Sequence, residues 1–145
     1  MNNIVSIKNL SISFKDNKQV VNDINLDIPK GKTVAIVGES GSGKTLSALS
    51  ILKLLPSGAK IDQGHIVFNN KDLLKLPVKE IEKIRGNRIS TIFQEPMSSL
   101  NPLHKIDKQI KEIIETHNEI NSHELNHTVM KLLHEVNLED LANRP

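Results

Sequence analysis

The sequence predicts an α/β fold in which a glycine-rich loop joins a buried strand to a helix. Three observations predict it. An unbroken apolar run at residues 34–37 fits a strand covered on both faces. The segment GESGSGKT, residues 38–45, follows that run directly. The apolar residues after it recur at helical spacing. We therefore expect a strand, a loop and a helix in this order.

Two further strands are expected before the glycine-rich loop. Apolar and polar residues alternate over residues 10–14, and a second alternation runs through the apolar positions 24, 26 and 28. A period of two places every second side chain on one face, so both segments are typical of strands with one buried face. The turn at residues 29–31 then leads into the buried strand at residues 32–37. The sequence thus predicts an antiparallel strand pair ahead of the loop.

Helices dominate the part of the chain that follows the loop. The expected elements, in order, are a helix at residues 48–55, a short strand around residues 66–68, a helix between Pro77 and Gly86, a strand at residues 88–93, and two amphipathic helices around residues 106–114 and 125–136. Asn121 precedes the last helix with Glu124 three residues on, which is a capping pattern. Two amphipathic helices joined by a polar turn predict a helical subdomain from about residue 95.

The glycine-rich segment matches G-x-x-x-x-G-K-[ST], a phosphate-binding pattern known as the P-loop. Glycines accept backbone angles that turn successive N–H groups inward, and such a ring of donors binds phosphate oxygens. The N-terminus of the next helix adds unpaired N–H groups and the positive end of a dipole. Lys44 is expected to reach the β- and γ-phosphates, and the Thr45 hydroxyl to ligate Mg²⁺. The competing interpretation is a glycine-rich turn without a ligand.

Composition narrows the range of functions. The 145 residues carry a formal net charge of +2 without a basic block, and aromatic residues make up only 2% of the chain. The chain therefore has neither the positive charge nor the aromatic rings for base stacking that would favour nucleic acid as a partner. Cysteine is absent, which excludes disulfides and a cysteine nucleophile. No window approaches the roughly 18 apolar residues that a membrane helix needs. We expect a cytoplasmic chain that does not itself span a membrane.

The histidines are weak candidates for a metal site. His123 and His127 stand one helical turn apart, a spacing that can bind a metal ion. His117 and His134 lie nearby in the sequence, but no carboxylate completes a pattern such as H-E-x-x-H. We interpret all four as solvated residues on helix faces.

The order of the motifs resembles the ATP-binding subunits of ABC transporters. An antiparallel strand pair ending in an aromatic residue is followed by GESGSGKT, by a strand ending in IFQ, and by a helical pattern. The segment FQEPMSSLNP, residues 93–102, is similar to the branch that powers oligopeptide, dipeptide and nickel importers. The resemblance implies an α/β P-loop NTPase, truncated, with an N-terminal antiparallel β subdomain and the start of an α-helical subdomain. The expected division is residues 1–94, the incomplete ATP-binding core, and residues 95–145, the start of the helical subdomain.

The resemblance also implies roles for individual residues. Phe14 would stack on the adenine ring, although a strand-end phenylalanine is ordinarily a core residue. Lys44 and Gln94 would be the catalytic residues. Gln94, with Thr45, would contact Mg²⁺ and position the attacking water, although its ordinary role would be to cap a strand end. The residues implied to bind the nucleotide are Phe14, Gly38, Glu39, Ser40, Gly41, Ser42, Gly43, Lys44 and Thr45.

The same resemblance implies cofactors, partners and a location. ATP and Mg²⁺ are the expected cofactors. The expected partners are a second ATP-binding subunit, two transmembrane permease subunits and, indirectly, a substrate-binding protein. The stretch from Glu95 to about Leu103 would line the groove where a permease helix docks; the alternative is a solvated, proline-containing loop. The location would be the cytoplasm, peripheral to the inner face of the cell membrane.

Features that this family needs for turnover are missing from the sequence. It contains no LSGGQ-type signature, no apolar run ending in Asp-Glu and no switch histidine in a matching context. Hydrolysis needs a second acidic group on Mg²⁺ and added charge stabilisation, so we expect weak nucleotide binding with negligible turnover. We also expect unpaired strand edges that favour aggregation. The alternatives are a nucleotide-binding or inert fragment, a P-loop kinase or small GTPase, and a non-transport P-loop ATPase.

Overall fold

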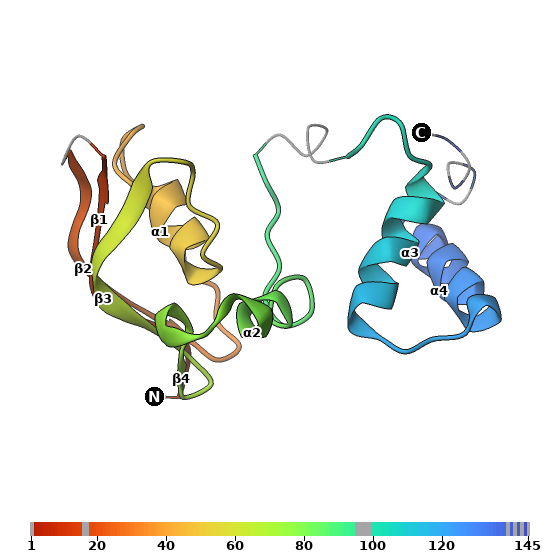
Figure 1. Cartoon of the computed structure of the whole chain (residues 1–145), viewed down its shortest axis with the longest axis horizontal. Helices are drawn as coiled ribbons and strands as arrows, with labels where there is room; N and C mark the ends of the chain where they lie inside the picture. The colour runs from red at the N-terminus through yellow and green to blue at the C-terminus, as the bar shows by residue number, and fades with distance from the viewer. Residues whose placement is uncertain are drawn as a thin grey trace. The chain divides into compact units, whose positions relative to one another are not determined.

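The computed structural model describes residues 2–15, 18–94 and 100–138, together with residues 140, 142 and 144. The chain divides into two compact units, Met1–Arg85 and Gly86–Pro145, which are described separately below. Figure 1 shows the order of the elements. The first unit contains β1 (Asn3–Phe14), β2 (Gln19–Pro29), α1 (Lys44–Ile51), β3 (Ala59–Phe68), β4 (Lys71–Asp72), the 3₁₀ helix η1 (Leu73–Lys75) and α2 (Val78–Glu82). The second unit contains α3 (Ile106–His117) and α4 (Ser122–Glu135).

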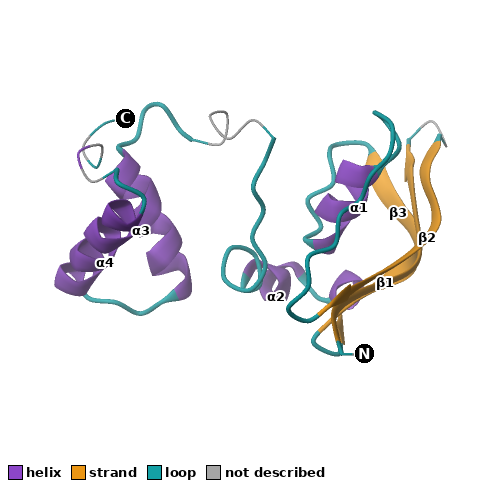
Figure 2. Ribbon diagram, turned by 180° about the vertical axis from the view of Figure 1, so that it is seen from behind, coloured by secondary structure: helices purple, strands orange, loops and turns teal. Residues whose placement is uncertain are grey.

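The first unit is built on an antiparallel sheet with the strand order β2-β1-β3-β4. β1 pairs with β2 on one side, where Ile12 faces Val21, and with β3 on the other, where Val5 faces Phe68. The predicted strand pair is confirmed, and β1 begins several residues earlier than the alternation indicated. In both ribbon views α1 lies against one face of this sheet (Figure 1 and Figure 2). Side chains that are fully buried in the first unit include Ile7, Leu10, Ile12, Ile66, Leu73 and Ile81.

Each of the three long strands contains a residue with positive φ, and all three residues lie where the register between the strands shifts. Asn9 of β1 has φ 49°, Asp23 of β2 has φ 48° and Gly64 of β3 has φ 114°. The register between β1 and its neighbours shifts in the same region. A Cβ at Gly64 would lie 2.7 Å from the Cα of Leu10, so β1 and β3 approach too closely there for any side chain. Asn9 Nδ2 donates to Asp23 Oδ1 at 2.8 Å, which stabilises the irregularity between β1 and β2.

A helix follows the glycine-rich loop as predicted, but it spans Lys44–Ile51 rather than residues 48–55, and serines make up its most buried positions. α1 begins directly after Gly43, and within it Ser47 and Ser50 are buried. Ser47 Oγ donates to the carbonyl of Gly43 at 2.9 Å, and Ser50 Oγ donates to the carbonyl of Ser47 at 2.7 Å. Each buried hydroxyl therefore has a partner in its own helix, which offsets the cost of removing it from water.

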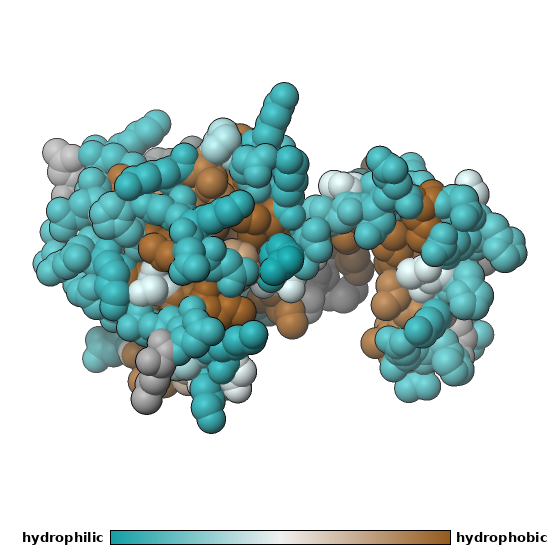
Figure 3. Space-filling model, turned by 90° about the horizontal axis from the view of Figure 1, so that it is seen from below, coloured by the Kyte–Doolittle hydropathy of each residue, from teal (hydrophilic) through white to brown (hydrophobic). Residues whose placement is uncertain are grey.

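Two predicted strands are absent from the described residues. Residues 32–37 and 88–93 lie outside every assigned strand. Val37 is 89% exposed and Ile92 is 94% exposed, and Figure 3 shows apolar surface, drawn in brown, in both units. Strand structure requires a neighbouring strand to accept and donate backbone hydrogen bonds, and no described strand pairs with either segment. Both strand predictions were wrong for this chain, and residues 34–37, which were expected to be covered on both faces, are exposed.

The second unit is a pair of helices around a small apolar core. Leu125, Val129 and Leu133 of α4 are buried with Ala142. Asn121 caps α4 by accepting a hydrogen bond from the N–H of Glu124 at 3.0 Å, as the capping pattern predicted. The isoleucines that pack against this core are Ile106, Ile110, Ile114 and Ile120.

Carbonyl groups of Ala142 and Arg144 cap the N-terminus of α3. The N–H of Ile106 donates to the carbonyl of Arg144 at 2.9 Å, and the N–H of Asp107 donates to the carbonyl of Ala142 at 3.1 Å. These bonds satisfy two of the N–H groups that the start of a helix leaves without an intrahelical partner. Within the described residues, no helix is both long enough and apolar enough to cross a membrane.

Candidate phosphate-binding loop

The glycine-rich segment adopts the left-handed backbone angles that a phosphate cradle requires at two positions. Gly41 has φ 78° and Gly43 has φ 86°. The N–H of Ser42 donates to the carbonyl of Glu39 at 3.3 Å and closes the turn. Gly43 is the residue at the N-terminal cap of α1, and no side chain caps that end. The first N–H groups of α1 therefore lack a side-chain acceptor, as expected where an anion binds.

Lys44 is held on the loop by three oxygen atoms. Its Nζ donates to the carbonyl of Gly38 at 2.7 Å, to the carbonyl of Glu39 at 2.5 Å and to Ser42 Oγ at 3.3 Å. An ammonium group has three N–H donors, so all of them are engaged within the loop. Lys44 can therefore donate to a phosphate only by exchanging at least one of these loop acceptors for a phosphate oxygen. Its role at the β- and γ-phosphates stays a prediction.

The loop also packs tightly against β2. A Cβ at Gly43 would lie 2.7 Å from Val21 Cγ2 and 3.0 Å from the carbonyl oxygen of Val20. Gly43 is itself buried, whereas Gly38, Glu39, Ser40, Gly41 and Ser42 are exposed. Thr45 is exposed at the second position of α1, which leaves its hydroxyl accessible to a cation. The strand pair and the loop are therefore in contact at β2.

Phe14 lies at the end of the hairpin that contacts the loop. It is the last residue of β1, and the register Ser13 to Gln19 brings that end beside Val20. Its N–H donates to the carbonyl of Lys18 at 3.1 Å, and Phe14 Cδ1 lies 3.8 Å from where a Cβ at Gly58 would be. Phe14 is only partly buried. The stacking role of Phe14 stays a prediction.

Gln94 belongs to the second unit and is exposed. Residues 95–99 of the expected docking stretch lie outside the described residues. The end of that stretch is held by Gln109 of α3, whose Oε1 accepts from the N–H of Asn101 at 2.9 Å and whose Nε2 donates to the carbonyl of His104 at 2.9 Å. Leu103, within this turn, is 87% exposed. A fixed turn with a protruding leucine fits a docking surface, and that role also stays a prediction.

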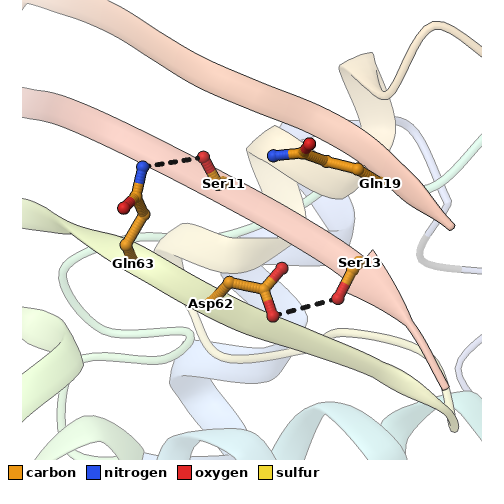
Figure 4. A pocket seen from close by; sticks show the side chains of 5 residues that line it. All are labelled: Ser11, Ser13, Gln19, Asp62 and Gln63. Atoms are coloured by element: carbon orange, nitrogen blue, oxygen red, sulfur yellow. Dashed lines mark hydrogen bonds between the residues drawn. The ribbon is translucent and has the colours of Figure 1, made fainter. Parts of the chain in front are cut away.

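An open cavity of about 300 Å³ lies on the polar face of the sheet (Figure 4). Ser13 Oγ donates to Asp62 Oδ1 at 3.0 Å, and Gln63 Nε2 donates to Ser11 Oγ at 3.2 Å. Ser11 Oγ also accepts from the N–H of Asp23 at 3.0 Å. These polar groups satisfy one another, so we interpret the cavity as a structural hydrogen-bond network. Its lining residues are Ser11, Ser13, Gln19, Asp62 and Gln63.

Metal ligands are not gathered elsewhere in the described residues. No three His, Cys, Asp or Glu side chains come together there in a way that could hold a metal ion. His123 and His127 are exposed on α4. The role of the Thr45 hydroxyl as a ligand for Mg²⁺ stays a prediction from the motif.

Sequence reasoning missed two groups that shape the loop's surroundings. Val20 and Gly58 neighbour Gly43 and Phe14, respectively, but each lies far from its neighbour's motif in the sequence. Local patterns report periodicity and turn preference, whereas these contacts arise from packing between elements. The sequence Pro56-Ser57-Gly58 is typical of a turn, which is a signal for a bend at Gly58 but not for its contact with Phe14.

Comparison with known proteins gives a consistent assignment. The ABC transporter family profile matches residues 21–145. The chain is 43% identical over 97% of its length to the peptidoglycan transport ATP-binding protein YejF of Agrobacterium fabrum, of which it covers 27%. It is 41% identical over 90% of its length to the oligopeptide transport ATP-binding protein OppD of Bacillus subtilis, of which it covers 37%. It is 40% identical over 99% of its length to the dipeptide transport ATP-binding protein DppD of the same organism, of which it covers 44%. The chain thus spans less than half the length of these curated relatives.

Solved structures agree with the fold. An ATP-binding cassette in a dimeric post-hydrolysis state bound to ADP and Pi superimposes with a TM-score of 0.79 at 26% identity, covering 97% of this chain and 60% of the solved chain. A dimeric bacterial ABC transporter cassette superimposes with a TM-score of 0.80 at 25% identity, with the same coverage of both chains. Together with the family profile, which matches most of the chain, these likenesses show that the protein belongs to the ABC transporter family.

Proposed function

We propose that this chain binds Mg-ATP at residues 38–45 and represents part of the ATP-binding subunit of an ABC importer for peptides. The observation that carries the proposal is the position of Lys44, whose Nζ is held at 2.7 and 2.5 Å by the carbonyls of Gly38 and Glu39 at the N-terminus of α1. A cation fixed beside unpaired helix N–H groups favours a polyphosphate.

The residues present fit both parts of the cofactor. Left-handed backbone angles at Gly41 and Gly43 allow the loop to curve around phosphate oxygens. Thr45, exposed at the start of α1, would hold Mg²⁺. Gln94, which the resemblance implies as a second contact, belongs to the other unit, and its role stays a prediction. The cation would neutralise charge on the β- and γ-phosphates. Phe14, at the tip of the hairpin that touches the loop, would stack on the base.

The substrate class and partners are inferred from the relatives. Oligopeptide and dipeptide transport proteins share 40–41% identity with the chain over nearly all of its length, which supports peptide import over nickel import. A second ATP-binding subunit, two permease subunits and, indirectly, a substrate-binding protein would complete the assembly. The chain would lie at the inner face of the cell membrane, with residues 95–103 against a permease helix.

We further propose that these residues bind nucleotide without appreciable turnover. ATP hydrolysis is a property of the family, but residues 1–145 contain neither the signature sequence nor an apolar run ending in Asp-Glu. Lys44 and Gln94 can stabilise and position, but they do not supply the second acidic ligand of Mg²⁺. The second candidate function, a nucleotide-binding module with no role in transport, rests on the same loop and differs only in its partners.

Titration with a fluorescent ATP analogue in the presence of Mg²⁺ tests the proposal. We expect saturable binding that Lys44→Ala weakens at least about tenfold, because charge-assisted bonds to phosphate are lost. Lys32→Ala removes the same charge from an exposed position outside the loop and serves as the matched control. Equal affinity in the two variants, or no binding by the unmodified chain, would refute ATP binding at this loop. Phosphate release measured on the same sample tests turnover, and release typical of the family would refute the proposed incompetence.

A further inference from the structure

The C-terminal end of α1 is tied to the segment that leads out of the first unit. α1 carries the phosphate-binding loop at its N-terminus and ends at Ile51. Arg85, the last residue of the first unit, donates from Nε to the carbonyl of Leu52 at 2.9 Å and from Nη2 to the carbonyl of Lys53 at 3.1 Å. Lys53 Nζ donates in turn to the carbonyl of Leu76 at 2.7 Å. We call these three bonds the α1 clamp.

The clamp holds residues 76–85 at both ends. Leu76 follows η1, Arg85 lies three residues beyond α2, and the N–H of Arg85 donates to the carbonyl of Ile81 at 3.0 Å. The backbone of Arg85 is thus hydrogen-bonded to α2, while its side chain is hydrogen-bonded to the residues that end α1. Because the guanidinium donates to two successive carbonyls, its orientation is fixed as well as its position. Movement of the end of α1 would therefore carry this segment with it.

The backbone of Lys53, whose side chain bonds Leu76, has a strained conformation. Its φ is 53°, a left-handed angle at the position after a helix where glycine is usual. The N–H of Leu54 donates to the carbonyl of Leu49 at 3.0 Å, and the N–H of Lys53 donates to the carbonyl of Ser50 at 3.1 Å, so the helix ends in a Schellman motif. Glycine would adopt this angle without strain but could not reach Leu76. Lys53, at this strained angle, supplies the hydrogen bond from α1 to Leu76. A lysine in place of glycine therefore points to a role beyond ending the helix.

We propose that Arg85 is a positioning residue of the ATP site, and that with Lys53 it transmits nucleotide binding from α1 to residues 76–85. This inference rests on the proposed ATP binding at residues 38–45. The Arg85 side chain donates to the carbonyls just after α1 and not to the loop, so Arg85 would act through α1. All three bonds of the clamp lie within the first unit.

Hydrogen–deuterium exchange of the whole 145-residue chain, with and without Mg-ATP, tests the clamp. In the unmodified chain we expect nucleotide to slow exchange in α1 and, by about fivefold or more, in residues 76–85. In Arg85→Gln we expect slowing in α1 to persist and the slowing in residues 76–85 to fall below about twofold. A purely structural role would speed exchange in residues 76–85 equally with and without nucleotide, and would leave the nucleotide-dependent change intact.

Two further variants keep the test decisive if Arg85→Gln folds poorly. Lys53→Gly removes the bond to Leu76 while relieving the left-handed strain, so we expect a stable chain whose nucleotide-dependent slowing in residues 76–85 is reduced. Lys83→Gln removes a charge from the same segment, where the lysine pairs with Glu80 at 2.8 Å, and should behave like the unmodified chain.

The outcomes separate this inference from the proposed function. If the unmodified chain does not bind nucleotide in the titration, the proposed function fails and the clamp's role in it fails with it. If it binds, but Arg85→Gln and Lys53→Gly both keep the full slowing in residues 76–85, the clamp is overturned and ATP binding stands. Loss of the slowing in Lys83→Gln as well would equally overturn a specific role for Arg85.

Discussion

The carbonyl oxygen of Val20 occupies the space that a side chain at Gly43 would need, because a Cβ there would lie 3.0 Å from it. Gly43 also has φ 86°, which costs a residue with a side chain about 1–2 kcal/mol. We expect Gly43→Ala to lower the free energy of unfolding by about 2–4 kcal/mol, because overpacking adds to that cost. Urea unfolding followed by circular dichroism measures it. Gly41→Ala is the matched control, since Gly41 has φ 78° and no atom within 4 Å of its Cβ position. Equal losses in both variants would contradict the contact.

Asp72 should make the first unit sensitive to acid. Burial raises the pKa of this carboxyl, but hydrogen bonds from His65 and from the N–H groups of Leu74 and Ile66 outweigh it and hold the pKa below its ordinary value. The side chain is only 15% exposed. A depressed folded-state pKa means that the carboxylate contributes stability above the ordinary pKa of about 3.9 and loses it as the pH falls through the folded-state pKa.

Asp72→Asn isolates that contribution, because it removes the charge and keeps an oxygen that can accept from Leu74. We expect the variant to be less stable than the unmodified chain at neutral pH, with the difference shrinking below about pH 4. Unfolding free energies measured across this range give the difference directly. Glu82→Gln, at an exposed position of α2, should show no such pH-dependent difference. A difference for Asp72→Asn that stays constant down to pH 2 would show that the charge is not involved.

Asn121 should account for a measurable part of the stability of α4. Its side chain accepts from the N–H of Glu124 at 3.0 Å, and Asn121 Nδ2 donates to Glu124 Oε2 at 3.3 Å. Asn121→Ala is expected to cost about 1 kcal/mol, the usual effect of losing such a cap. Asn121→Ser retains an accepting oxygen and should recover most of that loss. Thermal and urea unfolding would distinguish the two variants, and identical stabilities would argue against the cap.

Phe14 should account for the part of the nucleotide affinity that comes from the adenine base. If its ring stacks on adenine, Phe14→Ala should weaken ATP binding by about 1–3 kcal/mol, whereas Phe14→Tyr should bind nearly normally. Inorganic tripolyphosphate lacks a base and should bind Phe14→Ala and the unmodified chain equally well. Calorimetric titration with both ligands provides the comparison. A parallel loss of affinity for tripolyphosphate would place Phe14 in the core rather than at the base.

Local signals were enough to predict much of this structure. The alternation around Ile12 gave a strand, Asn121 with Glu124 gave the start of α4, and the spacing after Lys44 gave α1, because each depends on neighbours in the sequence. The loop was predictable for the same reason, since its glycines and lysine lie within eight residues that can be read directly.

The remaining features depend on contacts that sequence patterns do not contain. The segment at residues 32–37 has the composition of a strand, but a strand is defined by its neighbours, and the described residues provide none for it. Val20 against Gly43, and Arg85 against Leu52, join positions far apart in the chain through packing. The boundary after Arg85 separates two compact units of the structure. The functional boundary expected at residue 94 stays a prediction.

The three bonds that seat Lys44 on Gly38, Glu39 and Ser42 have a consequence for selectivity. Two of the three acceptors are main-chain carbonyls, so the backbone of the loop defines where the cation lies. The polyphosphate binding proposed for this loop would therefore depend on the phosphates and not on the heterocycle attached to them. Discrimination between adenine and guanine nucleotides must therefore come from outside the loop, at the end of the hairpin, where the chain offers an aromatic ring.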